Sequence, residues 1–287
     1  MYCMPRYAAI LAQCALWLLG TAHANVSVRD VDERDRETVI EITGEITNND
    51  AVKINDLVRR GMQTPKALHF QYWVVLDSVG GDLNAAMAIG RTLKMTTSHV
   101  VVKSLDGKWG GPDPKTGWIP YETKPATCAS ACVLILAAGS VRDAYVGDAS
   151  RDRIGIHRPY SATATGTATT AQSAIRYSAM AVEVRAYLME IGMPSHLYEE
   201  MMRVPAEKIR WLTMDDLHRL GLIGWDPAYE DAMDSQAAAR RGISMQEWLR
   251  RKVLADESCA FPNPPFNDPA VHAYIECKQK IMGPIIR

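Results

Sequence analysis

The chain contains the stretch Thr127-Cys128-Ala129-Ser130-Ala131-Cys132-Val133-Leu134-Ile135-Leu136-Ala137-Ala138-Gly139. One hydroxyl, that of Ser130, lies between small residues, and the apolar run after it predicts a buried helix of roughly ten residues. Small neighbours let a substrate carbonyl approach, and the start of a helix supplies a positive dipole where an oxyanion forms. The pattern is typical of a nucleophilic serine, but it equally fits a buried turn of small residues.

The first 24 residues have the features of a secretory signal peptide. Arg6 precedes an apolar run at 7–19 that leads to Ala22-His23-Ala24, so we predict cleavage after Ala24. The run is shorter than the ~20 residues that cross a bilayer, which disfavours an uncleaved anchor. Too little apolar sequence precedes Cys14 for a lipoprotein. We therefore expect a secreted, periplasmic protein with no membrane span after signal removal.

Charge and cysteine content narrow the function classes further. The formal net charge is −1, so no positive field exists that would attract nucleic acid, and we expect no such partner. Four cysteines follow the signal peptide, and an even number in an exported chain favours disulfides over a metal site. Cys259 and Cys277 are the expected pair. Cys128 and Cys132 either form a second disulfide, because their spacing places the Cα atoms near 6 Å, or remain buried thiols.

Strand and helix signals alternate along most of the chain, after a charged stretch at 25–37 that reads as a loose arm. The alternation predicts an α/β domain over 38–225 with a largely parallel sheet. A Gly/Pro/Trp-rich insertion at 105–125 and an Ala/Thr-rich loop at 161–173 interrupt it. Residues 226–287 are polar and helical, and we expect a C-terminal extension closed by the Cys259–Cys277 disulfide. Strands are predicted at 39–44, 71–77, 99–103, near 144–146, at 153–157 and at 209–212. Helices are predicted at 51–62, 83–93 and 174–191, with a shorter helix that ends at 202 and another that ends at Gly221.

Two further segments carry groups suited to catalysis. Gly80-Gly81 follows a buried strand and precedes a helix, where backbone N–H groups face an anion. A phosphate loop is disfavoured because no Gly-Lys-Ser/Thr follows, although a plain tight turn remains a reading of the glycine pair. His157 ends a strand just before Arg158-Pro159. A histidine in such a place is a candidate general base and, by itself, more often a structural residue.

Taken together, the segments resemble the ClpP serine protease family, within the ClpP/crotonase superfamily. The order and spacing match over Val39 to Gly224. The matching segments are Gly44, Asp77-Ser78-Val79-Gly80-Gly81, Ala129-Ser130-Ala131 with the helix ending Ala137-Ala138-Gly139, Ile156-His157-Arg158-Pro159, Trp211-Leu212-Thr213 and Gly221-Leu222-Ile223.

The resemblance implies a fold and a set of roles. The fold is a ClpP/crotonase-like spiral of ββα units. Ser130 is the nucleophile, His157 the general base, and the backbone N–H groups of Gly81 and Ala131, beside Gly80, form the oxyanion hole. The implied substrate is a peptide or unfolded polypeptide, the implied assembly a homo-oligomer, and no cofactor is expected.

One position departs from the family pattern. The family's aspartate falls at Ile209, which cannot orient an imidazole. Glu207 lies two residues earlier and is a substitute if both residues belong to one strand face, about 6–7 Å apart. Glu207 also reads as a solvated charge. The remaining options for the catalytic group are Asp152 as the acid, a Ser-His dyad without an acid, or a Ser-Lys dyad with Lys103 or Lys124.

Two other functions stay open. A non-catalytic relative keeps the fold as a binding or assembly module, which Ile209 favours. A crotonase-type acyl enzyme is disfavoured because it acts on CoA thioesters without a Ser-His pair. Trp109 and Trp118, in the insertion, either line a substrate cleft or anchor the insertion.

Overall fold

The computed structural model describes residues 25–32, 37–63, 71–103, 125–144, 146, 152–160, 170–260 and 268–284. Strands and helices alternate as expected, and five of the strand pairs in the sheet are parallel. The predicted fold class, α/β with a mostly parallel sheet, is therefore confirmed. The predicted signal peptide, the insertion with Trp109, Trp118 and Lys124, and most of the Ala/Thr-rich loop lie outside the described residues.

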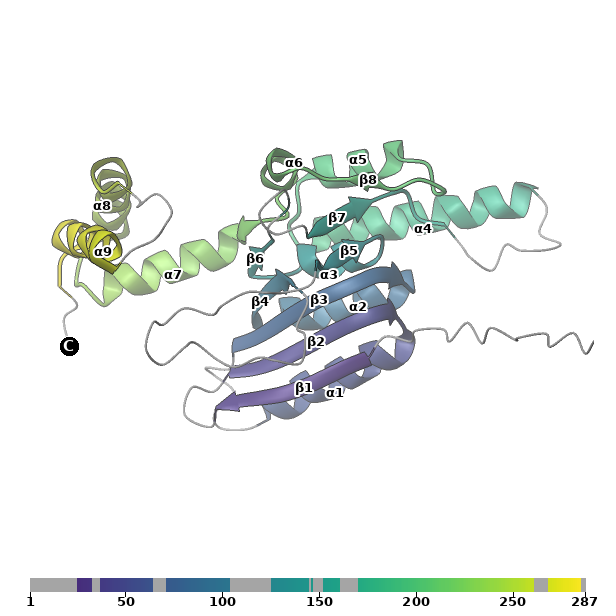
Figure 1. Cartoon of the computed structure of the whole chain (residues 1–287), viewed down its shortest axis with the longest axis horizontal. Coiled ribbons are helices and arrows are strands. Elements are labelled where there is room, and N and C mark those ends of the chain that lie inside the picture. The colour runs from purple at the N-terminus through teal and green to yellow at the C-terminus, as the bar shows by residue number, and fades with distance from the viewer. Residues whose placement is uncertain are drawn as a thin grey trace, which may run out of the picture.

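The strands form one sheet in which β3 (Gln71–Gly81) is central. On one side, β2 (Glu37–Ile46) pairs in parallel with β3 along its whole length. On the other side, β4 (Thr97–Val102) pairs in parallel with the first part of β3, and β5 (Thr127–Ala129) pairs with it at Ser78. The sheet therefore divides along β3 (Figure 1). The other strands are β1 (Asn25–Asp32), β6 (Val141–Asp143), β7 (Arg153–Ile156), β8 (Arg210–Trp211) and β9 (Gly224–Trp225).

The loose arm expected at 25–37 is wrong for its first part. Residues 25–32 form β1, which pairs antiparallel with β2 from Asn25↔Thr43 onward. Its charged residues suggested a solvated segment, but backbone pairing with a strand further along the chain orders it. The strand predicted near 144–146 instead ends at Asp143, and only an isolated bridge joins Val146 to Asp152.

Hydrophobic burial explains why the central elements are well defined. Tyr72, Val74, Val75 and Leu76 in β3 are all buried, as expected of a parallel strand that is covered on both faces. Helix α1 (Asn48–Met62) and helix α2 (Leu83–Lys94) pack against each other on one face of the sheet (Figure 1). Asp82 caps α2 by accepting a hydrogen bond from the Ala85 N–H at 2.7 Å.

The apolar run after Ser130 forms helix α3 (Cys132–Ala137), shorter than the ten residues expected. Every residue of α3 is fully buried, so the helix is anchored in the core of the domain. Beyond it lie α4 (Thr170–Glu190), α5 (Ser195–Arg203) and α6 (Met214–Arg219). Because α3 cannot shift without disturbing the core, it gives Ser130 a rigid support.

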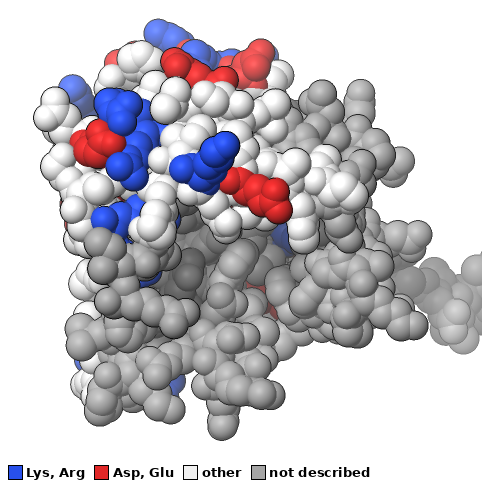
Figure 2. Space-filling view, turned by 90° about the vertical axis from the view of Figure 1, so that its left-hand side faces the viewer, with Lys and Arg blue, Asp and Glu red and all other residues white. Residues whose placement is uncertain are grey.

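The C-terminal extension consists of α7 (Pro227–Ala239), α8 (Met245–Ser258) and α9 (Asp268–Met282) around a small core of its own, in which Trp248 is buried. Figure 2 views the protein from this side and shows basic and acidic side chains next to one another. The extension is attached to the sheet at Asp226, whose carboxylate binds Lys94 at 2.5 Å and whose N–H donates to the Ser140 carbonyl at 2.8 Å.

Both cysteine pairs are disulfide-bonded. The expected Cys259–Cys277 bridge is present, with a Cα separation of 5.7 Å, and it links the end of α8 to α9. Of the two states considered for Cys128 and Cys132, the bonded one is found, with a Cα separation of 5.3 Å.

Candidate active site

Ser130 occupies a sharp turn between β5 and α3. Its φ is 56°, and no other non-glycine residue in the described ranges has a positive φ. An L-residue in this region costs about 1–2 kcal/mol, so the surrounding structure must hold it there. The Ser130 N–H donates to the Gly155 carbonyl at 2.9 Å, and its own carbonyl accepts from the Val133 N–H at 3.1 Å.

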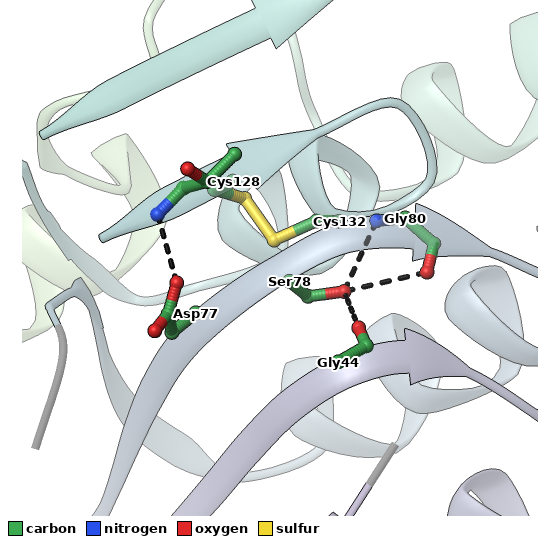
Figure 3. Close-up of a disulfide and its surroundings, with 7 residues drawn as sticks. Gly44, Asp77, Ser78, Gly80, Cys128 and Cys132 are labelled. Carbon is green, nitrogen blue, oxygen red and sulfur yellow. Dashed lines mark hydrogen bonds between the residues drawn. A yellow bond between two sulfur atoms is a disulfide. The ribbon is translucent and has the colours of Figure 1, made fainter. Parts of the chain in front are cut away.

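The Cys128–Cys132 disulfide spans this turn (Figure 3). Cys128 belongs to β5 and Cys132 begins α3, so the bridge covalently fixes the two residues that flank the Ala129-Ser130-Ala131 segment. Both cysteines are fully buried, whereas Ser130 is partly exposed. The disulfide thus restrains the turn from its buried side, while Ser130 remains accessible.

Gly80 lies directly against the Ser130 turn. A Cβ added to Gly80 would lie 2.8 Å from Ser130 Cβ and 3.2 Å from the Ala131 nitrogen. Gly80 also has a φ of 107°, so both its conformation and its surroundings require glycine. This close approach brings the end of β3 to the start of α3.

The three predicted oxyanion-hole residues do not play the same part. The Gly80 N–H already donates to Ser78 Oγ at 3.1 Å, and Ser78 in turn donates to the Gly44 carbonyl (Figure 3). Gly80 is therefore a packing residue rather than an anion donor. The Ala131 N–H has no acceptor within the described ranges, and Ala131 and Gly81 both line the cavity described below.

His157 follows β7 and is only 5% exposed. Its Nδ1 lies 2.8 Å from the backbone carbonyl of Arg158. Because a carbonyl only accepts, Nδ1 must carry the hydrogen, which leaves Nε2 as the acceptor. This is the tautomer that a general base requires.

The Arg158 carbonyl is itself held in place. The Arg158 N–H donates to the Val204 carbonyl at 3.0 Å, and its guanidinium lies 5.5 Å from the centre of the Tyr177 ring in α4. The Tyr160 ring packs beside the imidazole, with ring centres 5.5 Å apart. The backbone carbonyl and these neighbours thus orient His157.

Ser130 and His157 line one cavity of about 890 Å³. The predicted residues Gly80, Gly81, Ala131 and Glu207 line it as well, and so does Ile209. These predicted residues therefore lie around one cavity, and their catalytic roles stay predictions. No direct hydrogen bond between Ser130 Oγ and His157 occurs among the described contacts, and catalytic hydrogen bonds are often longer before a substrate binds.

The predicted candidate for the third catalytic residue is Glu207. Glu207 makes no hydrogen bond to His157 in the described structure, and it lies in a turn, because β8 begins only at Arg210. The expectation that Glu207 and Ile209 share a strand face is therefore wrong. Ile209 is 45% exposed, so the family's aspartate position has not become a core residue.

Asp152 and Lys103 lie elsewhere. Asp152 precedes β7, about 16 Å from His157 along the strand at ~3.3 Å per residue, and accepts a hydrogen bond from the Ala126 N–H. Burial raises the pKa of Asp152 despite this bond. Burial also lowers the pKa of Lys103, against the attraction of Asp152 and Asp143. Neither side chain lines the cavity, so neither supplies an acid or a Ser-Lys dyad there.

Three features of the site have no clear sequence signal. The Arg158 carbonyl acts through its backbone, and backbone acceptors occur at every residue. Tyr160 and Met180 line the cavity from a loop and from α4, and only the folded chain brings them to Ser130.

The described residues contain no group of three or more His, Cys, Asp or Glu side chains that could hold a metal ion. In the same part of the chain, no helix combines the length and the apolar character that a membrane crossing requires. What the cavity does offer is a serine in a strained turn, an oriented imidazole and, at a helix start, a backbone N–H that has no acceptor among the described residues. Such groups suit acyl transfer through a covalent intermediate.

No family model matches the chain, and no curated protein matches it. Among solved structures, the chain is similar to a mutant of ClpP1 from Listeria monocytogenes, with 16% sequence identity and a TM-score of 0.44. The similarity covers 68% of this chain and 95% of that one.

Proposed function

We propose that the protein is an exported serine hydrolase that cleaves peptides, with Ser130 as nucleophile and His157 as general base. The observation that carries the proposal is the presence of two features in one cavity. Ser130 is held at a positive φ, and His157 is held in the tautomer with Nε2 as acceptor.

The reaction follows from these positions. Ser130 Oγ attacks the carbonyl carbon of the substrate while its proton passes to His157 Nε2. The negative charge that develops on the carbonyl oxygen is stabilised by the Ala131 N–H at the start of α3. His157 then donates the proton to the leaving amine, and a water molecule, deprotonated by His157, releases the acid product from Ser130.

Export is part of the proposal. The predicted signal peptide motivates it, and the two disulfides support it, because disulfides persist in oxidising compartments. A peptide substrate, and assembly with further copies of the chain, rest on the resemblance to the ClpP family.

A non-catalytic binding module is the second candidate. It is favoured by Ile209 at the family's aspartate position and by the lack of a direct Ser130–His157 hydrogen bond in the described contacts. In that case the cavity would bind a peptide without cleaving it.

Fluorophosphonate labelling of the purified mature protein separates the two. A hydrolase gives one covalent adduct, located on Ser130 by mass spectrometry, and His157→Ala slows its formation by orders of magnitude. The Ser130→Ala protein is the matched control and takes up no label. If the wild-type protein takes up no label but still binds peptides, the hydrolase is excluded and the non-catalytic binding module is supported.

A further inference from the structure

The cavity that contains Ser130 and His157 has an unbalanced charge. Three acidic residues and no lysine or arginine are among the described residues that line it: Glu45, Asp82 and Glu207. Asp82 caps α2 through its carboxylate, whereas Glu45 and Glu207 are exposed and form no ion pair with another described residue. The cavity therefore presents two uncompensated carboxylates to a ligand.

Acidic side chains elsewhere on the protein are often neutralised by neighbours. Glu200 contacts Arg203, Arg210 and Arg219. Glu247 binds Arg250 and Arg251, and these hydrogen bonds lower its pKa to about 2. Glu45 and Glu207 come from segments that are far apart in the sequence, the end of β2 and the turn after α5, yet both reach the cavity.

The same cavity also has apolar walls. Val79 is 65% exposed and Ile209 is 45% exposed, and both line it together with Met180 and the Tyr160 ring. Large apolar side chains at an opening favour a ligand that covers them. Beside them lies His157, 5% exposed, whose Nε2 makes no hydrogen bond with the described residues.

We propose that this cavity selects peptides with a lysine or arginine side chain near the bond to be cleaved. The aliphatic stem would cover Val79 and Ile209, and the cationic end would lie between Glu45 and Glu207, since long basic side chains combine an apolar stem with a charged tip. The inference rests on the proposed function and assigns Glu207 to substrate selection instead of to the orientation of His157.

The test uses two N-acetylated fluorogenic peptides that differ only in lysine versus norleucine, which has a similar stem without the charge. With the wild-type protein at low ionic strength, we expect kcat/KM for the lysine peptide to be about tenfold higher, the sum of two exposed charge contacts. Most of the difference should lie in KM. Added salt should reduce it, because exposed charges are screened.

The variant Glu45→Gln/Glu207→Gln should bring the lysine-to-norleucine ratio close to one. Glu183→Gln is the matched control, because Glu183 is exposed on α4 and does not line the cavity. It should leave the ratio unchanged. Melting temperatures of both variants show whether folding is retained.

The same peptides are also bound to the Ser130→Ala protein and followed by fluorescence anisotropy, which needs no catalysis. If the Ser130→Ala protein binds the lysine peptide preferentially but the wild-type protein cleaves neither peptide, the proposed hydrolase function is wrong and the selective binding site is retained. Turnover with equal rates for both peptides, or a preference that persists in the double variant, would overturn the inference and keep the hydrolase.

Discussion

The imidazole Nδ1 of His157 donates its hydrogen to the backbone carbonyl of Arg158, 2.8 Å away. An aspartate in a serine protease triad fixes the same tautomer from the same side of the ring. The carbonyl supplies the orientation but no full negative charge, so it stabilises the imidazolium less than a carboxylate does. Under the proposed function, the site would therefore work as a Ser-His dyad in which a main-chain carbonyl takes the place of the third residue.

Adding a carboxylate at the family's aspartate position should not restore a triad. In Ile209→Asp, the new carboxylate meets an imidazole whose Nδ1 hydrogen is already engaged. We expect kcat to stay within about threefold of Ile209→Asn, the uncharged control, compared with the roughly 10⁴-fold effect of a triad acid. A kcat that rises a hundredfold over the asparagine variant would show that Nδ1 is free to change partner.

Removing the Cys128–Cys132 disulfide should impair both stability and catalysis. A closed loop of this length contributes roughly 2 kcal/mol to the free energy of unfolding. In Cys128→Ala/Cys132→Ala, Ser130 also loses a restraint on its positive φ, so kcat should fall at least tenfold. Urea unfolding and peptidase assays measure the two effects.

Cys259→Ala/Cys277→Ala is the control for that experiment. Its longer loop contributes more stability, roughly 3 kcal/mol, but it lies in the C-terminal extension away from the cavity. We expect a larger loss of stability with unchanged kcat. Equal kcat in both double variants would contradict a specific role for the Cys128–Cys132 bridge.

Substitution of Gly80 should displace Ser130. The Cβ of Gly80→Ala would lie 2.8 Å from Ser130 Cβ and the main chain has a φ of 107°, so steric clash and backbone strain act together. We expect a loss of about 2–4 kcal/mol in the free energy of unfolding and a strong fall in kcat.

Gly192→Ala separates strain from clash. Gly192 has a φ of 80°, but no atom lies within 4 Å of its added Cβ. That variant should lose only about 1–2 kcal/mol, the strain alone, and keep its kcat. If both glycine variants lose the same stability and activity, close packing against Ser130 is not the cause.

The Lys94–Asp226 ion pair predicts an acid-sensitive attachment of the C-terminal extension. Burial by itself would raise the pKa of Asp226, but the Lys94 hydrogen bond, the Tyr229 N–H and the positive charges of Lys94 and Arg142 outweigh it and lower the pKa below the usual 3.8. A lowered folded-state pKa stabilises the protein above the unfolded value. This stabilisation is lost as the pH falls below about 4 towards the folded-state pKa.

We therefore expect Asp226→Asn to cost about 1–2 kcal/mol at pH 7 and to flatten the acid decline measured by urea unfolding from pH 6 to pH 2.5. Asparagine can still cap α7, so the cap is retained. Glu190→Gln, which removes the exposed Arg91–Glu190 pair, should change stability by less than about 0.5 kcal/mol. If the stability of Asp226→Asn falls with decreasing pH as steeply as that of the wild type, other carboxylates cause the decline.

The sequence predicts the elements whose own apolar pattern determines their burial. It does not predict those whose structure depends on contacts with segments far away in the sequence. The start of β3 and nearly all of α2 are confirmed, because their burial follows from their own apolar pattern, although β3 continues four residues beyond the predicted end at Asp77. Strand β1 was missed because only pairing with β2 orders it. Ser130 and His157, which were predicted to act together, line one cavity. The strand position predicted for Glu207 is wrong because the chain turns before β8 begins.

The turn that holds Ser130 also determines when in folding the site is complete. Its N–H requires the Gly155 carbonyl from a later segment, and its flank requires Gly80 from an earlier one. Contacts between segments this far apart form late, because the intervening chain must first be ordered. If Ser130 is the nucleophile, as proposed, a chain that is still emerging or only partly folded has no assembled site and cannot cleave itself.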